Sequence, residues 1–465
     1  MGDQPHVCVV VDNPLRDLEG LVLLARQLAT RGARATLVPM YEQGFDVPAL
    51  RPDLVLVNYT RPNNAELIKS YKRAGILVGV LDTEGIGGKN ADQFATMVKS
   101  AGCPDLVDLY CVWGQSQYAA FLRQGTVAEG LLHATGCPRY DFCAPPWRAA
   151  LPTPPVVSGY VLINTNFPTV NPRFSNSTSH EEVSMVKAGF SREFARQFIA
   201  DAGHAYRSAL KMAIKLARHL PSVEFVLRPH PFENIGSYDS FAALPNAKVI
   251  QSGTSLEWIS GARLLVHQNC STAIEATMLN VEPLSMEWFN TPGLRLDAAT
   301  RVSRGAAGEA EMLELVQQGL ENRLPPLTSE TEAFRREIIK DLYTAVDGAS
   351  SARVSEAVLA TIVEPARSQS ATQRIPSPSW RGLAAGAVRR TLGHSASLLL
   401  RRIYSSAESE RRRAGKAFDV AMVDAILRRL DGASKDSRRF VARPAEYARM
   451  RRMASGTSLQ LVETN

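Results

Sequence analysis

The chain has 465 residues, 45% of them hydrophobic and 21% charged, which is the composition of a soluble globular protein. That length exceeds one ordinary hydrophobic core, so we expect more than one domain. Residues 366–465 hold 20 basic and 8 acidic residues, an excess of +12 that leaves residues 1–365 at −5, and this acidic body argues against nucleic acid as a partner.

The N-terminus gives no sign of export. The segment MGDQPHVCVVVD has no basic region ahead of its apolar run, so a signal peptide is not expected. No run approaches the roughly 18–20 apolar residues that span a bilayer. The six cysteines form no CxxC pair, which favours a reduced, cytoplasmic setting.

The first 150 residues alternate short apolar runs with longer amphipathic segments. The clearest runs are HVCVVVD at 6–12, LVLVNYT at 54–60, ILVGVLD at 76–82 and DLYCVWG at 108–114. Strands of this kind, separated by helix-length segments, predict a parallel sheet covered on both faces. We therefore assign residues 1–150 to a Rossmann-like domain, ended by a proline-rich linker at 143–157.

A second series of strands follows the linker. It begins with GYVLINTNF at 159–167 and predicts a second Rossmann-like domain over residues 151–330. Residues 331–365 are expected to form closing helices. Residues 366–465 are expected to be a basic linker and a mainly helical tail, with apolar residues at helical spacing around 396–404 and 418–430.

Two polar strings in the second domain directly follow apolar strands. RPHPFE at 228–233 follows VEFVL, and HQNCSTAIEA at 267–276 follows RLLV. In open α/β sheets, ligands bind outside the carboxyl ends of the strands, which is where these strings would lie. The residue types suit a nucleotide, because cations and hydroxyls bind phosphate and a carboxylate accepts hydrogen bonds from ribose.

Each residue of these strings has an expected role. Arg228 and His230 would bind the donor phosphate, with Pro231 stiffening the turn that aims the imidazole. Ser271 and Thr272, at the start of a predicted helix, would offer hydroxyls and free N–H groups to the same phosphate, or would cap the helix. Glu275, one helical turn later, would bind the ribose. His267 is expected to be structural.

The end of the first strand of the second domain carries small polar residues. Thr165 and Asn166 are expected to contact the diphosphate or the transferred sugar, whereas Asn164 would point away on a regular strand. The loop that follows, residues 168–182, has the composition of a lid or of an ordinary surface loop.

Acid–base chemistry is expected from the first domain. Asp82 and Glu84 follow the strand at 76–82, and we prefer Glu84 as general base or nucleophile because Asp82 can cap the following turn. Later strand ends of this domain are expected to line the same site with Trp113, Gly114, Gln115, Arg139 and Asp141, although Trp113 also fits core packing. The glycines at 85–88 do not follow the dinucleotide spacing, and no cluster has metal-ligand spacing, so we expect no bound metal and no nicotinamide cofactor.

Six strings in this order resemble the bacterial surface carbohydrate biosynthesis family over roughly residues 7–287. They are LDTEG, VWGQSQ, ATGCPRYD, LINTNF, RPHPFE and HQNCSTAIEA. The resemblance implies a metal-independent glycosyltransferase of the GT-B fold, two Rossmann-like domains facing a cleft, encoded with capsule or lipopolysaccharide genes. The last two strings also resemble transferases of CMP-linked ulosonic acids such as Kdo, CDP-glycerol phosphotransferases and the UDP-GlcNAc 2-epimerase.

The resemblance leaves the reaction open. Our first interpretation is transfer from a nucleotide sugar, CMP-linked as first choice and UDP- or GDP-linked as alternatives, to a surface polysaccharide or lipid-linked glycan. A nucleotide-sugar epimerase has the same fold, and an inactive scaffold in glycan assembly is a third possibility. The basic tail has three interpretations. It contacts the anionic inner face of the cytoplasmic membrane, it is a solvated and partly disordered tail, or its helices pack on the body or on another subunit.

Overall fold

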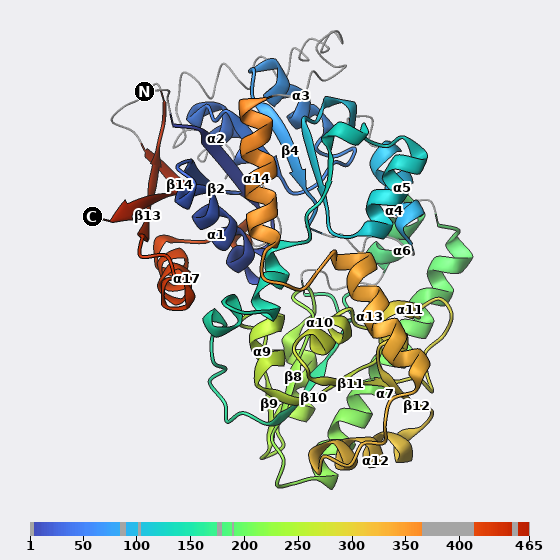
Figure 1. The fold of residues 1–465 in the computed structure, drawn as a ribbon. Coiled ribbons are helices and arrows are strands. Elements are labelled where there is room, and N and C mark those ends of the chain that lie inside the picture. Colours follow the sequence, from blue (N-terminus) through green and yellow to red (C-terminus); the bar gives the residue numbers. More distant parts are fainter. Residues whose placement is uncertain are drawn as a thin grey trace. The chain divides into compact units, whose positions relative to one another are not determined.

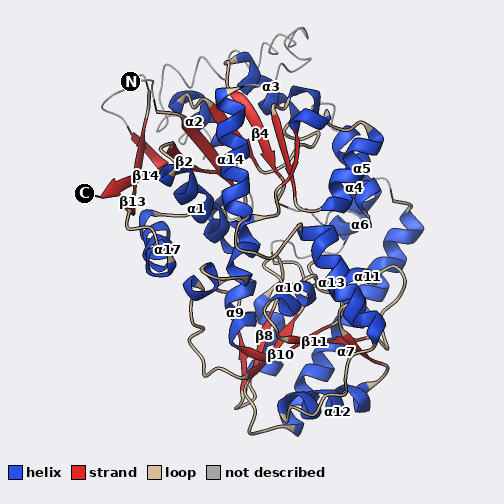
Figure 2. Ribbon diagram, viewed as in Figure 1, coloured by secondary structure: helices blue, strands red, loops and turns tan. Residues whose placement is uncertain are grey.

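The computed structural model describes residues 4–83, 90–100, 104–173, 179–187, 190–364, 413–448 and 454–464. The chain forms two compact units, one comprising Met1–Ala150 and Ile339–Asn465 and the other Leu151–Ile338. Each unit is built on one sheet with helices on both faces (Figures 1 and 2). The fold is therefore α/β with two doubly wound units, as the resemblance to GT-B proteins implies.

The first unit contains an eight-stranded sheet in the order β13-β14-β2-β1-β3-β4-β5-β6. The strands from β1 to β6 are parallel, and almost all of their residues are buried, as expected for a sheet covered on both faces. The parallel strands are β1 (His6–Val11), β2 (Arg34–Pro39), β3 (Leu54–Val57), β4 (Leu77–Leu81), β5 (Leu109–Val112) and β6 (Leu132–Ala134).

The helices of the first unit divide between the two faces of this sheet. Helices α2 to α5 share one apolar core with the strands, and α1 and α14 contact the strands as well. Helix α1 begins at Pro14 behind Asn13, whose side chain accepts a hydrogen bond from the Leu15 amide. The helices are α1 (Pro14–Thr30), α2 (Gln43–Leu50), α3 (Ala65–Arg73), α4 (Ala91–Ser100), α5 (Gln115–Gln124), α14 (Ser350–Val363) and α17 (Val420–Ala433), with 3-10 turns at Pro104–Leu106, Glu129–Leu131, Pro138–Cys143 and Trp147–Ala150.

The C-terminal segment differs from the expected helical tail. Helix α17 lies where helical spacing was predicted, but β13 (Arg439–Glu446) and β14 (Ala454–Thr464) form an antiparallel hairpin that pairs with the edge of β2. In Figure 1 this hairpin, in red, extends the sheet of the first unit. The described part of the tail is therefore an integral element of that unit.

Helix α17 covers most of residues 418–430, one of the two segments of the tail that were expected to contact a membrane. Its apolar side chains Val423, Ile426, Leu427 and Leu430 are buried, and the helix packs on α1. Because the protein body already covers this apolar face, it is not available to a lipid surface. The other segment, residues 396–404, lies outside the described residues.

The second unit contains a parallel six-stranded sheet in the order β12-β11-β10-β7-β8-β9. Helices α7, α8 and α12 share one apolar core with the strands, and α9 and α10 contact β7, β10 and β11. The strands are β7 (Tyr160–Asn164), β8 (Phe225–Arg228), β9 (Ala247–Val249), β10 (Ala262–His267), β11 (Glu282–Met286) and β12 (Arg304–Ala306). The helices are α6 (Ser179–Lys187), α7 (Arg192–His219), α8 (Asp239–Ala242), α9 (Ser255–Gly261), α10 (Thr272–Met278), α11 (Asp297–Arg301) and α12 (Glu309–Leu320), with a 3-10 turn at Ile235–Tyr238; α13 (Ser329–Tyr343) runs across the boundary between the units.

Candidate functional site

The strand order of the second sheet identifies one place for a ligand. The first strand of the unit, β7, lies between β8 and β10, so the connections run in opposite directions on its two sides. In doubly wound sheets the ligand crevice lies outside the carboxyl ends of the strands at this reversal. The strings RPHPFE and HQNCSTAIEA follow β8 and β10, the two strands that flank β7.

Glu233, the last residue of RPHPFE, holds the loops after β7 and β8 together. Its buried carboxylate accepts four hydrogen bonds, from the Thr165 hydroxyl at 2.9 Å, the Phe167 amide at 3.1 Å, the His230 amide at 2.9 Å and the Tyr238 hydroxyl. Burial raises the pKa of Glu233, and the four hydrogen bonds oppose that shift. Glu233 was not among the predicted site residues, although its place at the end of the strand-end string RPHPFE was a signal for a role in the site.

Thr165 therefore takes part in this network. Its hydroxyl donates to Glu233 and its oxygen lies 3.1 Å from the Tyr238 hydroxyl oxygen, and the residue is 7% exposed. Asn166 instead donates from its amide to the Asn269 carbonyl at 3.1 Å, which ties the loop after β7 to the loop after β10. Thr165 and Asn166 therefore hold the loops after β7, β8 and β10 together. Their expected contacts with the diphosphate or the transferred sugar stay predictions.

Arg228 ends β8 with its guanidinium partly enclosed. One Nη donates to the carbonyls of Ser252 and Gly253, at 3.2 and 2.9 Å, and the group lies over the Trp258 ring. Loss of solvation lowers the pKa of Arg228 to about 10, against the attraction of Glu257 and Glu275. No carboxylate of the described residues forms a salt bridge with Arg228 within 4.0 Å, so its charge suits an anionic ligand.

His230 is fixed by its own turn. Its amide donates to Glu233, and its Nδ1 accepts from the Phe232 amide at 3.2 Å. An Nδ1 that accepts leaves the proton of the neutral ring on Nε2. Pro231 adds its carbonyl, which accepts from Arg173 at 3.3 Å and joins the described start of the 168–182 loop to this turn. Residues 174–178 of that loop lie outside the described residues.

At the start of α10, Ser271 is the N-cap residue and its side chain makes no capping hydrogen bond. The Thr272 hydroxyl donates to the Cys270 sulfur and accepts from the Asn164 amide at 2.9 Å. Asn164 was expected to point away, but the strand ends at this residue, so the strand alternation does not continue through it. Asn164 thus bridges β7 and the loop after β10, across the strand reversal.

Glu275 lies one turn into α10 and is 5% exposed. Its carboxylate accepts from the Ser255 hydroxyl, at 2.6 Å, which belongs to the first turn of α9. The expected contact of Glu275 with a ribose hydroxyl stays a prediction.

His267, expected to be structural, is fully buried at the end of β10. Its Nε2 lies 2.8 Å from the Ser303 hydroxyl, and its Nδ1 accepts from the Cys270 amide. Burial lowers its pKa to about 3.

The buried, neutral His267 predicts acid sensitivity of the second unit. The unfolded chain binds a proton at this histidine below its ordinary pKa of about 6.5 and the folded unit does not, so stability falls as the pH drops from about 6.5 toward 3. The expected slope is about 1.4 kcal/mol per pH unit. Urea unfolding followed between about pH 7 and pH 5 measures it, and His267→Gln should flatten the slope. An equal slope in the variant contradicts this assignment.

The catalytic candidates of the first unit are only partly described. Asp82 follows β4 and is 2% exposed, and its backbone carbonyl accepts from the Trp113 indole at 2.7 Å. Glu84 lies outside the described residues.

Trp113 and Asp141 are both buried, and for Trp113 this is the core packing that was its alternative interpretation. Trp113 stacks on Tyr343. Asp141 accepts from the amides of Ser350 and Ser351, both at 2.8 Å, and so caps the start of α14.

No group of three or more His, Cys, Asp and Glu side chains of the described residues is placed to hold a metal ion. Among the same residues, no helix combines the length and apolar character needed to cross a membrane.

Comparison with known proteins gives structural matches only. No protein-family model and no curated protein match the chain. A protein described as a UDP-N-acetylglucosamine 2-epimerase from Listeria monocytogenes matches with 11% identity and a TM-score of 0.49, over 78% of this chain and 98% of that one. The UDP-GlcNAc 2-epimerase from Neisseria meningitidis matches with 12% identity and a TM-score of 0.45 (76% and 99%), and the calicheamicin glycosyltransferase CalG4 with 14% and 0.42 (78% and 100%). These values transfer no activity to this chain.

Proposed function

We propose that this protein is an enzyme acting on a nucleotide sugar, with the nucleotide bound on the second unit. The main support is the convergence of Arg228, His230 and the start of α10 at the strand reversal of the second sheet. The partly enclosed guanidinium of Arg228, the Nε2 of His230 and the hydroxyls of Ser271 and Thr272 are donors suited to phosphate oxygens. Glu275 would then accept from the ribose hydroxyls.

Two chemistries fit this proposal. The sequence resemblance favours glycosyl transfer, with a CMP-linked ulosonic acid as donor and a surface or lipid-linked glycan as acceptor. Several matched structures are named as UDP-GlcNAc 2-epimerases, with UDP-GlcNAc or UDP bound, and epimerisation therefore stands beside transfer. Asp82 and Glu84 remain our candidates for the base or nucleophile in either reaction.

Product analysis with the nucleotide sugar alone separates the two chemistries. UDP-GlcNAc and a CMP-linked ulosonic acid are incubated with the full chain, without an acceptor, and the products are identified by NMR. An epimerase converts the sugar of its donor, whereas a transferase at most hydrolyses it slowly. A folded protein that binds nucleotide and does neither, with or without glycan acceptors, is the inactive scaffold.

For the nucleotide site we predict that His230→Ala and Glu275→Ala each weaken nucleotide binding. Loss of a charge-assisted hydrogen bond costs about 1.5–3 kcal/mol, which corresponds to roughly 10- to 100-fold in affinity. Isothermal titration with UDP, CMP, CDP and GDP measures the effect. His219→Ala, an exposed histidine in the last turn of α7, is the matched control and should bind like the wild type. If both His230→Ala and Glu275→Ala bind nucleotide with wild-type affinity, the nucleotide binds elsewhere on the protein.

A further inference from the structure

The first sheet also reverses its strand order, and polar side chains gather at that point. Its first strand, β1, lies between β2 and β3. Asp12, Asn58 and Asp82 follow the adjacent strands β1, β3 and β4, and they are 7%, 2% and 2% exposed. The rule that places ligands at strand reversals therefore applies to this sheet as well.

Asn58 has a buried amide group that the protein leaves unsatisfied. Within the described residues, neither its Nδ2 nor its Oδ1 has a hydrogen-bond partner. Its backbone carbonyl accepts from the Thr83 amide at 3.0 Å, which fixes the main chain at the end of β3. Folded proteins rarely bury an unsatisfied amide, because this costs about 1–3 kcal/mol, so such a group indicates a missing partner.

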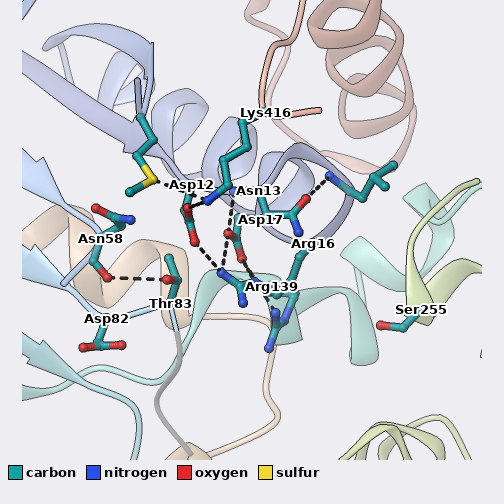
Figure 3. Close-up of polar contacts among 12 residues, drawn as sticks. Asp12, Asn13, Arg16, Asp17, Asn58, Asp82, Thr83, Arg139, Ser255 and Lys416 are labelled. Atoms are coloured by element: carbon teal, nitrogen blue, oxygen red, sulfur yellow. Dashed lines mark hydrogen bonds and ion pairs between the residues drawn. The ribbon is translucent and has the colours of Figure 1, made fainter. Parts of the chain in front are cut away.

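Charged residues around Asp12 balance one another (Figure 3). Arg16 donates to Asp12 at 3.0 Å and to Asp17 at 2.8 Å, and Lys416 also donates to Asp12. Arg139 lies 3.7 Å from Asp17. The carboxylates of Asp12, Asp17 and Asp82 are matched by the cations Arg16, Arg139 and Lys416. The group therefore offers hydrogen-bond donors and acceptors without a net charge. This balance suits neutral hydroxyl groups better than a phosphate or a metal ion.

Lys416 reaches this group from the C-terminal segment. Besides Asp12, its ammonium contacts the Met40 sulfur at 3.5 Å and lies 5.7 Å from the centre of the Tyr41 ring. Its side chain is 19% exposed and that of Arg16 is 29% exposed, so the group reaches the protein surface. An ammonium has three donors, so Asp12 alone does not saturate it.

We propose that Asp12, Asn58 and Lys416 form a binding subsite for a neutral, hydroxyl-rich glycan, and that the C-terminal segment completes it with Lys416. A sugar hydroxyl donates to a carboxylate while it accepts from an ammonium or an amide, and these three side chains offer that combination. This inference rests on the proposed function, because it takes a glycan to be the acceptor substrate. It assigns the binding of that acceptor to residues of the first unit.

The test combines glycan binding with thermal unfolding of the full chain. The probe is an array of neutral oligosaccharides, and the variants are Asn58→Leu, Lys416→Met and the control Lys435→Met, whose lysine is exposed. We expect the wild type and the control to bind the same glycans, and Asn58→Leu and Lys416→Met to lose about tenfold or more in affinity. Asn58→Leu should also unfold about 2 °C or more above the wild type, because a buried unsatisfied amide has been removed.

The thermal readout separates a ligand-binding amide from a structural one. A lower unfolding temperature in Asn58→Leu means that the amide supports the fold and overturns the proposal. Absence of glycan binding by the wild type, or wild-type binding by both variants, overturns it as well. Nucleotide titrations on the same samples report on the proposed function, since loss of glycan binding with intact nucleotide binding contradicts the subsite alone.

Discussion

Truncation after Glu364 is expected to unfold the first unit. The deletion removes β13, β14 and α17, whose side chains Leu427, Leu430, Phe440, Leu459 and Leu461 are at most 4% exposed. Each such side chain contributes about 1.5–3 kcal/mol, so their joint loss is comparable to the roughly 5–15 kcal/mol that stabilises a domain. The edge of β2 would also lose its partner strand.

Polar contacts make the same segment hard to replace. Asp46 is fully buried, and its carboxylate accepts from the hydroxyls of Tyr447 at 3.0 Å, Ser455 at 2.6 Å and Ser458. Truncation removes all of these donors and leaves a buried charge without them, which is strongly unfavourable.

Hydrogen exchange measures the outcome of the truncation. Backbone amides of β1 and β2 should lose protection, whereas those of β7, β8 and β10 should keep it. If the truncated chain is insoluble, Leu430→Ala tests the same claim in the full chain, with an expected cost of about 2–5 kcal/mol. Its matched control, Arg428→Ala, changes an exposed residue of the same helix and should cost less than about 0.5 kcal/mol. Unchanged protection of β1 and β2 in a soluble truncated chain contradicts the prediction.

The strands of both sheets were predictable from the sequence because they are buried on both faces. A strand covered on both faces has few polar positions, which gives near-continuous apolar runs such as HVCVVV (β1) and LVLV (β3). Helical spacing also located α17 correctly. The hairpin of β13 and β14 was missed because its basic residues were interpreted as a solvated tail.

The charge pattern of the chain has a structural counterpart. The acidic body and the basic C-terminal segment pair with one another, through Arg413 and Glu42 at 3.7 Å, Arg429 and Glu19, and Lys416 and Asp12. Composition showed the imbalance but not which partner balances it, because that depends on where the segment packs.

The candidate nucleotide site was predictable in position but not in detail. Strand ends located Arg228, His230 and the start of α10, since the end of a buried apolar run is visible in sequence. The orientation of Asn164 and the partners of Thr165 depend on loop conformation, which alternation along a strand does not fix beyond its last residue. Glu233 was missed because its four donors come from three separate places in the sequence.

Replacement of Glu233 by alanine is expected to destabilise the second unit and to abolish nucleotide binding. Thr165, Phe167, His230 and Tyr238 would each lose their acceptor. A buried donor left unsatisfied costs about 1–3 kcal/mol, so a total of about 3 kcal/mol or more is expected, which lowers the unfolding temperature by about 6 °C or more.

Glutamine at position 233 separates positioning from stability. Glu233→Gln keeps the shape and one acceptor oxygen but places an NH₂ against donors, so it should cost less stability than alanine. Because the His230 amide depends on this acceptor, nucleotide affinity should still fall by about tenfold. Thermal unfolding and nucleotide titration of both variants, with Glu321→Ala at the exposed end of α12 as the unaffected control, measure the two effects. If Glu233→Ala melts at the wild-type temperature, the buried network does not stabilise the second unit. If a folded Glu233→Gln binds nucleotide with wild-type affinity, Glu233 does not position the nucleotide site.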